Sequence, residues 1–116
     1  MIKEKDLVMY SRSTGCPFVT LAKRVLDDYG IPYREIFIDE DMVARERVKH
    51  WTGFYSVPTL VIAYAGQDTP YEPPADIDIG TSPRGVNRGT MITEPNIIEL
   101  TEWLRQHELI KDKDHV

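Results

Sequence analysis

The residue best suited to covalent chemistry is Cys16, the only cysteine of the chain, in the stretch SRSTGCPFVT that starts at Ser11. It stands between Gly15 and Pro17, where a short apolar run has ended and a helical pattern begins. Its sulfur would face the unpaired backbone N–H groups and the positive end of that helix, which favour the thiolate, the nucleophilic form of cysteine. Arg12 could add positive charge. Most lone cysteines are small buried hydrophobes, but the flanking glycine, the proline and the helix start favour a reactive thiol here.

A second stretch, FYSVPTLVI (54–62), places Pro58 at the start of an apolar run typical of a central strand. The simplest explanation is that proline is tolerated as the first residue of a strand. A sharper one is a cis peptide bond between Val57 and Pro58, which would turn the backbone of Val57 toward a ligand. The residues alone leave both explanations open.

Other chemistry-bearing residues are sparse. One cysteine cannot form an internal disulfide, and a zinc site would need ligands that the sequence barely offers. The histidines, His50, His107 and His115, are far apart and lack ligand spacing. We therefore expect no protein-held metal site.

Strands and helices must alternate to position Cys16 and Pro58. We expect strands at 6–10, 33–39 and 59–64, with helices at about 18–30, 40–52 and 95–109. The apolar face of each helix follows the spacing of one helical stripe: Phe18, Leu21, Ala22, Val25, Leu26 and Tyr29 in the first, Ala44, Val48 and Trp51 in the second, and Ile97, Leu100 and Leu104 in the third. Asp39 is the expected cap of the second helix; Thr93 is that of the third, with Pro95 in its first turn. A βαβ unit with a right-handed crossover makes the first two strands parallel, in a three-layer α/β domain.

Residues 65–89 interrupt this regularity. The segment is rich in proline and glycine, has no helical period and is long for a connection within a compact domain. ADIDIG (75–80) alternates well enough for a short strand, although GTMIT (89–93) is the better candidate for the last strand of the sheet. We interpret 1–116 as a single domain that carries this insertion.

Composition restricts the partners and the compartment. With 41% hydrophobic and 28% charged residues, the chain reads as one soluble domain. A net charge of -5, spread along the sequence, argues mildly against nucleic acid or anionic membranes as partners. The start MIKEKD leads into an apolar run too short for a secretory signal, so the expected location is the cytoplasm.

Taken together, VMYSRSTGCPFVTLAKRVLDDYGIPYREIFIDED, then TGFYSVPTLVI, then a helix beginning TEPNIIEL resemble the glutaredoxin family of the thioredoxin fold. The resemblance covers both ends of the chain and misses mainly residues 65–89. It implies a four-stranded mixed sheet flanked by helices, in the order β-α-β-α-β-β-α. It also implies a nucleophilic Cys16, a cis-proline at Pro58 facing it, and glutathione as the thiol partner.

The resemblance further implies which residues would bind glutathione. Val57 would pair its backbone with the cysteinyl part, while Pro17 and Phe18 belong to the motif that follows the nucleophile. Two basic residues match family positions. Arg12 matches the basic residue upstream of the nucleophile, and Lys49 matches the residue that meets the glycine carboxylate of glutathione. Thr93 and Glu94 stand about where the family holds the γ-glutamyl end, but its glycine pair and aspartate are not recognisable there. Arg84 and Arg88 of the insertion could reach an anionic ligand instead, although solvated loop arginines are the commoner outcome.

The motif CPFV differs from the usual family motifs. Dithiol members have a second cysteine where this chain has Val19, so the resemblance implies a monothiol cycle on glutathione mixed disulfides. Cluster-binding members have Cys-Gly-Phe-Ser, whose glycine and serine are replaced here by Pro17 and Val19.

Three functions therefore stay open. The first is a glutathione-dependent thiol–disulfide oxidoreductase, which we expect to be monomeric. The second is a carrier in which Cys16 of two subunits and two glutathiones hold a [2Fe-2S] cluster. The third is an adaptor with a vestigial thiol, whose insertion, for example around Tyr71, binds a protein partner.

Overall fold

The fold is a four-stranded mixed sheet with three helices, in a computed structural model that describes residues 4–110. The elements are β1 (Lys5–Ser11), α1 (Pro17–Asp28), β2 (Arg34–Phe37), α2 (Met42–Thr52), β3 (Thr59–Tyr64), β4 (Met91–Thr93) and α3 (Ile97–Gln106). The strand order is β2-β1-β3-β4; β1 and β2 are parallel, and the other two pairings are antiparallel. This arrangement confirms the expected element order and the thioredoxin-like fold.

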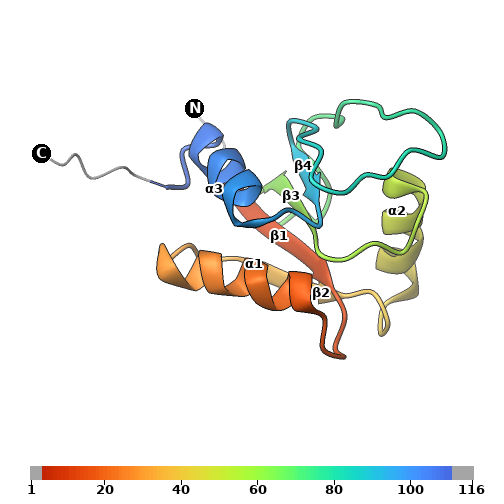
Figure 1. Cartoon of the computed structure of the whole chain (residues 1–116), viewed down its shortest axis with the longest axis horizontal. Coiled ribbons are helices and arrows are strands. Elements are labelled where there is room, and N and C mark those ends of the chain that lie inside the picture. Colours follow the sequence, from red (N-terminus) through yellow and green to blue (C-terminus); the bar gives the residue numbers. More distant parts are fainter. Residues whose placement is uncertain (1–3, 111–116) are drawn as a thin grey trace, which may run out of the picture.

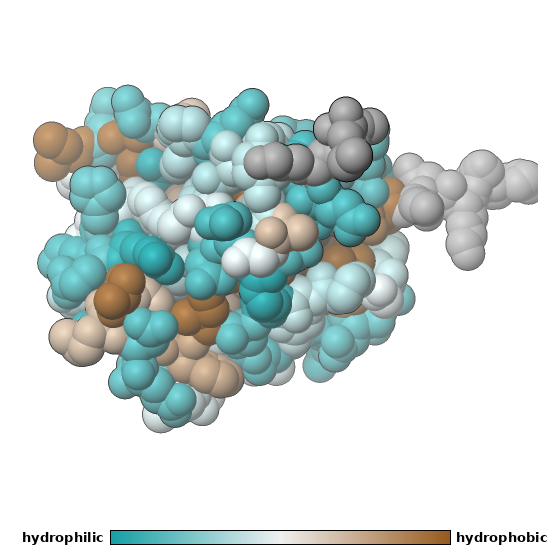
Figure 2. Space-filling view, turned by 180° about the vertical axis from the view of Figure 1, so that it is seen from behind, coloured by the Kyte–Doolittle hydropathy of each residue, from teal (hydrophilic) through white to brown (hydrophobic). Residues whose placement is uncertain are grey.

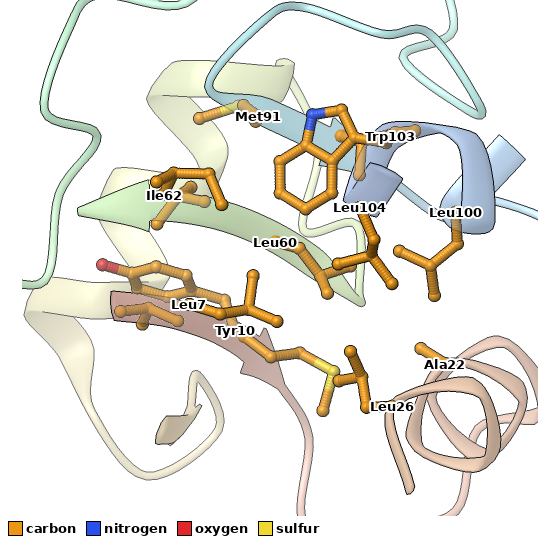
Figure 3. Packing of buried hydrophobic residues seen from close by; sticks show 14 of the residues in the cluster. Leu7, Tyr10, Ala22, Leu26, Leu60, Ile62, Met91, Leu100, Trp103 and Leu104 are labelled. Atoms are coloured by element: carbon orange, nitrogen blue, oxygen red, sulfur yellow. The ribbon is translucent and has the colours of Figure 1, made fainter. Parts of the chain in front are cut away.

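The helices form two layers around the sheet. α1 and α3 pack against each other on one face, and α2 lies on the other (Figure 1). In Figure 3, Ala22 and Leu26 of α1 and Leu100 and Leu104 of α3 point toward one another and toward Leu60 of β3. All five are buried. Because α1 is packed in this way along its length, its N-terminal end is held in a fixed position beside the sheet.

α2 is held to the opposite face by an aromatic contact. The ring of Trp51 lies 5.3 Å from that of Tyr10 of β1 in an edge-to-face arrangement, a geometry that aromatic pairs favour. Ala44 and Val48 of the predicted apolar face are buried, and Trp51 is half-buried. The chain therefore leaves α2 for β3 in a defined direction.

The predicted start of α2 was wrong. The N-cap is Asp41, whose carboxylate accepts a hydrogen bond from the Ala44 amide at 3.1 Å, and the helix begins at Met42. The predicted cap, Asp39, lies outside the helix and binds Ser13 instead. Two aspartates stand close together at this boundary, and the one whose side chain reaches the amide three residues later forms the cap.

The predicted start of α3 was also wrong. Asn96 caps this helix: its side chain accepts from the Glu99 amide, and the Glu99 carboxylate accepts from the Asn96 amide. This reciprocal capping box puts Ile97 at the exposed start of the helix, 50% accessible, and Trp103 joins Leu100 and Leu104 in the core. Thr93, the predicted cap, belongs to β4.

The insertion has a defined path along the sheet but forms no helix, and residues 75–80 form no strand. Ile79 is fully exposed, because no neighbouring strand pairs with this stretch and buries its alternating side chains. Elsewhere the segment follows β3, where the Tyr71 amide donates to the Ile62 carbonyl at 2.9 Å. The Tyr71 ring packs 5.5 Å from that of Tyr64 and lies under the Lys5 amine. Tyr71 is therefore used in packing.

The surface seen from behind is largely hydrophilic and is interrupted by small apolar areas (Figure 2). Within residues 4–110, no helix has the length and apolar character needed to cross a bilayer.

Candidate functional site

Cys16 is the N-cap residue of α1. Its backbone is extended, with φ -147° and ψ 124°, and its carbonyl accepts the first helical hydrogen bond, from the Thr20 amide at 3.0 Å. The side chain forms no capping hydrogen bond and is half-buried. Pro17, in the first turn, has no amide to leave unpaired. The sulfur therefore lies at the N-terminal end of the helix and is not engaged in holding that end together.

The turn before β3 faces this sulfur. The Val57–Pro58 peptide bond is cis, as the sharper of the two sequence interpretations expected. The Sγ atom of Cys16 lies 3.9 Å from the Val57 carbonyl oxygen. Two segments about forty residues apart in sequence thus meet at one point, with the thiol on one side and the Val57 backbone on the other.

The loop that leads to Cys16 is anchored by Asp39, which sequence reasoning assigned to another role. Its carboxylate accepts from the Ser13 amide at 3.2 and 3.3 Å and from the Ser13 hydroxyl. These bonds, the hydroxyl first among them, lower the pKa of Asp39, and the positive charge of Arg12 adds a smaller effect in the same direction. Arg12 itself is exposed on this loop. No local pattern could have revealed this contact, because it joins residues on either side of α1 and β2.

The end of β4 forms the next wall of the site. The Glu94 amide donates to the Pro58 carbonyl at 2.8 Å, which ties the two turns together. The Thr93 side chain is buried, with its hydroxyl 3.1 Å from that of Thr59. Glu94 has a φ of 46°, the left-handed region that non-glycine residues rarely adopt.

One arginine of the insertion reaches the site. Arg84 contacts the Glu94 carboxylate at 3.3 Å, and its guanidinium carbon lies 4.9 Å from the centre of the Phe18 ring. Phe18 is half-buried in the first turn of α1, two residues after Cys16. Arg84 therefore links the insertion to α1 and to the end of β4.

Arg88, the other candidate, does not reach the site, so the suggestion that it meets an anionic ligand is corrected. Its side chain is buried and donates to the carbonyls of Ala75 at 2.7 Å and Trp51 at 2.6 Å. Burial lowers the pKa of Arg88, and Asp76 opposes that effect. Nor is it a solvated loop arginine: it joins the insertion to the end of α2.

Lys49 lies near the end of α2 and is exposed. Its amine is 4.9 Å from the centre of the Tyr55 ring, and the Arg45 guanidinium carbon is 4.5 Å from the same ring. Tyr55 is 43% exposed and belongs to the turn that leads to Pro58. Two cations thus flank the approach to this turn.

Metal ligands are not grouped in the part of the chain that the structure describes. Among residues 4–110, no group of three or more His, Cys, Asp or Glu side chains is placed to hold a metal ion; His115 lies outside these residues. For a [2Fe-2S] cluster, the whole chain supplies one thiolate, so three further ligands would have to come from a second subunit or from glutathione.

The stretch that contains Cys16 and Pro58 also matches a known family. A model of the Glutaredoxin family matches residues 7–64, a span that runs from β1 to the end of β3 and includes Cys16 and Pro58. No curated protein matches the chain.

Proposed function

Because the chain belongs to the glutaredoxin family, we propose that it reduces glutathione mixed disulfides by a monothiol mechanism at Cys16. One observation carries the proposal: the only thiol of the chain lies at the N-terminal end of α1, 3.9 Å from the carbonyl of the residue before cis-Pro58. Val19, buried one turn further along α1, occupies the place where a resolving cysteine would stand.

The reaction proceeds in two exchanges. The Cys16 thiolate attacks the glutathione sulfur of a mixed disulfide, the disulfide bond breaks, and the substrate leaves as a thiolate that takes up a proton. Cys16 is then bound to glutathione by a new disulfide. The thiolate of a second glutathione attacks the glutathionyl sulfur, which releases the Cys16 thiolate and oxidised glutathione. Overall, the thiol of the second glutathione is oxidised, the substrate sulfur is reduced to a thiol, and the two glutathione sulfurs end joined in one disulfide.

The surrounding groups have defined roles in this cycle. The sulfur of Cys16 lies at the N-terminal end of α1, where the helix dipole favours negative charge on the nucleophile and on the leaving group. The Val57 amide donates to no acceptor among residues 4–110, so it is available to pair with the peptide backbone of glutathione. Arg12 and Lys49 supply positive charge for the carboxylates of the tripeptide.

Substitution of the nucleophile tests the proposal. With a glutathionylated peptide as substrate and glutathione as reductant, the wild-type protein should accelerate release of the peptide thiol. Cys16→Ser should reduce this to the rate without protein, because a serine hydroxyl cannot carry the disulfide. Thr20→Ser, one turn further along α1 and exposed, is the matched control and should keep the activity. Full activity in Cys16→Ser would contradict the proposal, whereas a wild-type protein that does not accelerate release would favour the adaptor hypothesis.

Anaerobic reconstitution with iron, sulfide and glutathione separates the oxidoreductase from the cluster carrier. We expect the protein to stay colourless and monomeric. A brown dimer whose absorbance is lost in Cys16→Ser would favour the carrier.

A further inference from the structure

We propose that Arg84 is a specificity-determining residue that favours disulfide substrates bearing a carboxylate near the reacting sulfur. This inference rests on the proposed function, because it concerns the substrate side of the Cys16 site. It assigns a chemical role to the insertion at 65–89, which lies outside the sequence motifs that contain Cys16 and Pro58.

The segment that carries Arg84 is fixed against the sheet. Arg84 forms an isolated parallel bridge with Thr93, and the Gly85 amide donates to the Thr93 carbonyl at 2.7 Å. Pro83 before it is buried. The backbone of the segment therefore continues the sheet beyond β4 and places the Arg84 side chain at a defined edge.

The same segment lies against the first turn of α3. A Cβ atom at Gly85 would lie 2.6 Å from each carboxylate oxygen of Glu99, so a larger residue would push that side chain aside, and the φ of 73° also favours glycine. Glu99 is also the residue that closes the capping box of α3. This close approach fixes the insertion beside the first turn of α3, and Arg84 reaches from there to the first turn of α1.

Two contacts hold the guanidinium of Arg84 between the first turn of α1 and the residue that follows β4. On one side it lies over the ring of Phe18, which follows Cys16 by two residues in α1. On the other side it contacts Glu94, whose amide is bonded to the carbonyl of Pro58. Arg84 thus spans the two walls between which the substrate disulfide must enter.

The Arg84–Glu94 pair is suited to exchange. It is a single contact at 3.3 Å, in which the Arg84 side chain is 60% exposed and the Glu94 side chain is 16% exposed. A guanidinium has five donors and binds carboxylates in a bidentate manner, so this one contact leaves donors of Arg84 open to solvent. A substrate carboxylate can therefore bind the donors that Glu94 leaves open or displace Glu94. Glu94 would then act as an internal competitor that sets how strongly carboxylates are preferred.

The direct test measures the second-order rate constant for modification of Cys16 by two disulfides, followed by mass spectrometry. Oxidised glutathione carries carboxylates, and 2-hydroxyethyl disulfide carries none. The ratio of the two rate constants isolates charge recognition, because any change in the reactivity of the sulfur itself affects both reactions.

We expect Arg84→Ala to lower this ratio about tenfold, the loss of one charged hydrogen-bonded contact, with the 2-hydroxyethyl disulfide rate nearly unchanged. Glu94→Gln should raise the ratio, and Arg84→Ala combined with Glu94→Gln should behave like Arg84→Ala alone. Arg24→Ala, an exposed arginine on α1, is the matched control and should leave the ratio unchanged. Added salt should lower the wild-type ratio toward that of Arg84→Ala.

An unchanged ratio in Arg84→Ala would overturn the inference, as would an equal slowing of both disulfides, which would indicate a structural clamp. A ratio that Glu94→Gln fails to raise would overturn the competition between Glu94 and substrate. Failure of wild-type Cys16 to react with either disulfide would instead overturn the proposed function, so the two failures are distinguishable.

Discussion

At the scale of single residues, the site is positioned by backbone contacts more than by side-chain pairs. Cys16 caps α1 with its carbonyl, leaving the thiol unused for capping, and its sulfur lies beside the carbonyl of Val57. The loop before it is held by the bonds from Ser13 to Asp39. The position of the sulfur therefore depends on residues that take no part in the reaction.

The Ser13–Asp39 contact gives a prediction with a defined sign. The Ser13 hydroxyl is the largest cause of the lowered pKa of Asp39, so Ser13→Ala should raise that pKa toward its ordinary value. Because the folded-state pKa is depressed, the contribution of Asp39 to loop stability is present above its unfolded-state pKa. It is lost as the pH falls through the folded-state pKa.

Carboxyl-carbon NMR titration of Asp39 measures this directly. Ser56→Ala removes a hydroxyl from the turn before Pro58. It serves as the control and should leave the pKa of Asp39 unchanged. A titration of Asp39 that is the same with and without the Ser13 hydroxyl would show that the contact does not hold the loop.

Local sequence was sufficient to place Cys16 at a helix start and Pro58 directly before a strand, because both are short-range signals. Local sequence could not predict that Asp39 binds Ser13 or that Arg84 lies beside Phe18. Those contacts form only when β2 lies next to β1 and the insertion lies next to β4.

At the scale of elements, the alternation of strands and helices and the start of α1 could be predicted, whereas the starts of α2 and α3 could not. The capping box of Asn96 and Glu99 is a sequence signature, but Thr93 competed with it as a cap two residues before Pro95. The stretch 75–80 alternates like a strand and forms none. Alternation predicts a strand only where a neighbour is available for pairing, and that depends on the path of the whole insertion.

The insertion is fixed to the rest of the fold by Arg88. Its guanidinium donates to the carbonyls of Ala75 and Trp51 from a buried position. Arg88→Ala should lower the free energy of unfolding by about 2 to 4 kcal/mol, because two acceptors lose their donor and a cavity forms. Arg88→Lys should recover little of it, because a single ammonium cannot reproduce the fork of donors.

Urea unfolding followed by tryptophan fluorescence measures this loss, with Arg24→Ala as the surface control. If Arg88→Ala were no less stable than that control, the guanidinium would not be what fixes the insertion to α2.

At the scale of the whole molecule, Tyr10 joins three parts of the fold. It lies in β1, its ring packs on Trp51 of α2, and its hydroxyl donates to the Asp68 carbonyl of the insertion. Burial is the largest cause of its raised pKa, which Arg47 partly opposes. The side chain is therefore neutral in the folded protein to a higher pH than in the unfolded chain.

This sets the direction of the alkaline dependence of stability. The contribution of Tyr10 is fully present below the unfolded-state pKa of about 10 and is lost as the pH rises through the folded-state value. The free energy of unfolding should fall in this alkaline range, and less steeply in Tyr10→Phe. The pKa of Tyr33 is also raised by burial, so Tyr33 should still contribute to the alkaline fall in the free energy of unfolding in that variant. Equal slopes in the two proteins would mean that Tyr10 titrates alike in the folded and unfolded states, which would contradict its raised pKa.

The most direct test of the monothiol cycle is to isolate its intermediate. Wild-type protein treated with oxidised glutathione should gain one glutathionyl group per chain, located at Cys16 by peptide mass spectrometry. Added glutathione should remove it and release one oxidised glutathione. Failure of Cys16 to take up glutathione, or an adduct that glutathione does not release, would contradict the mechanism.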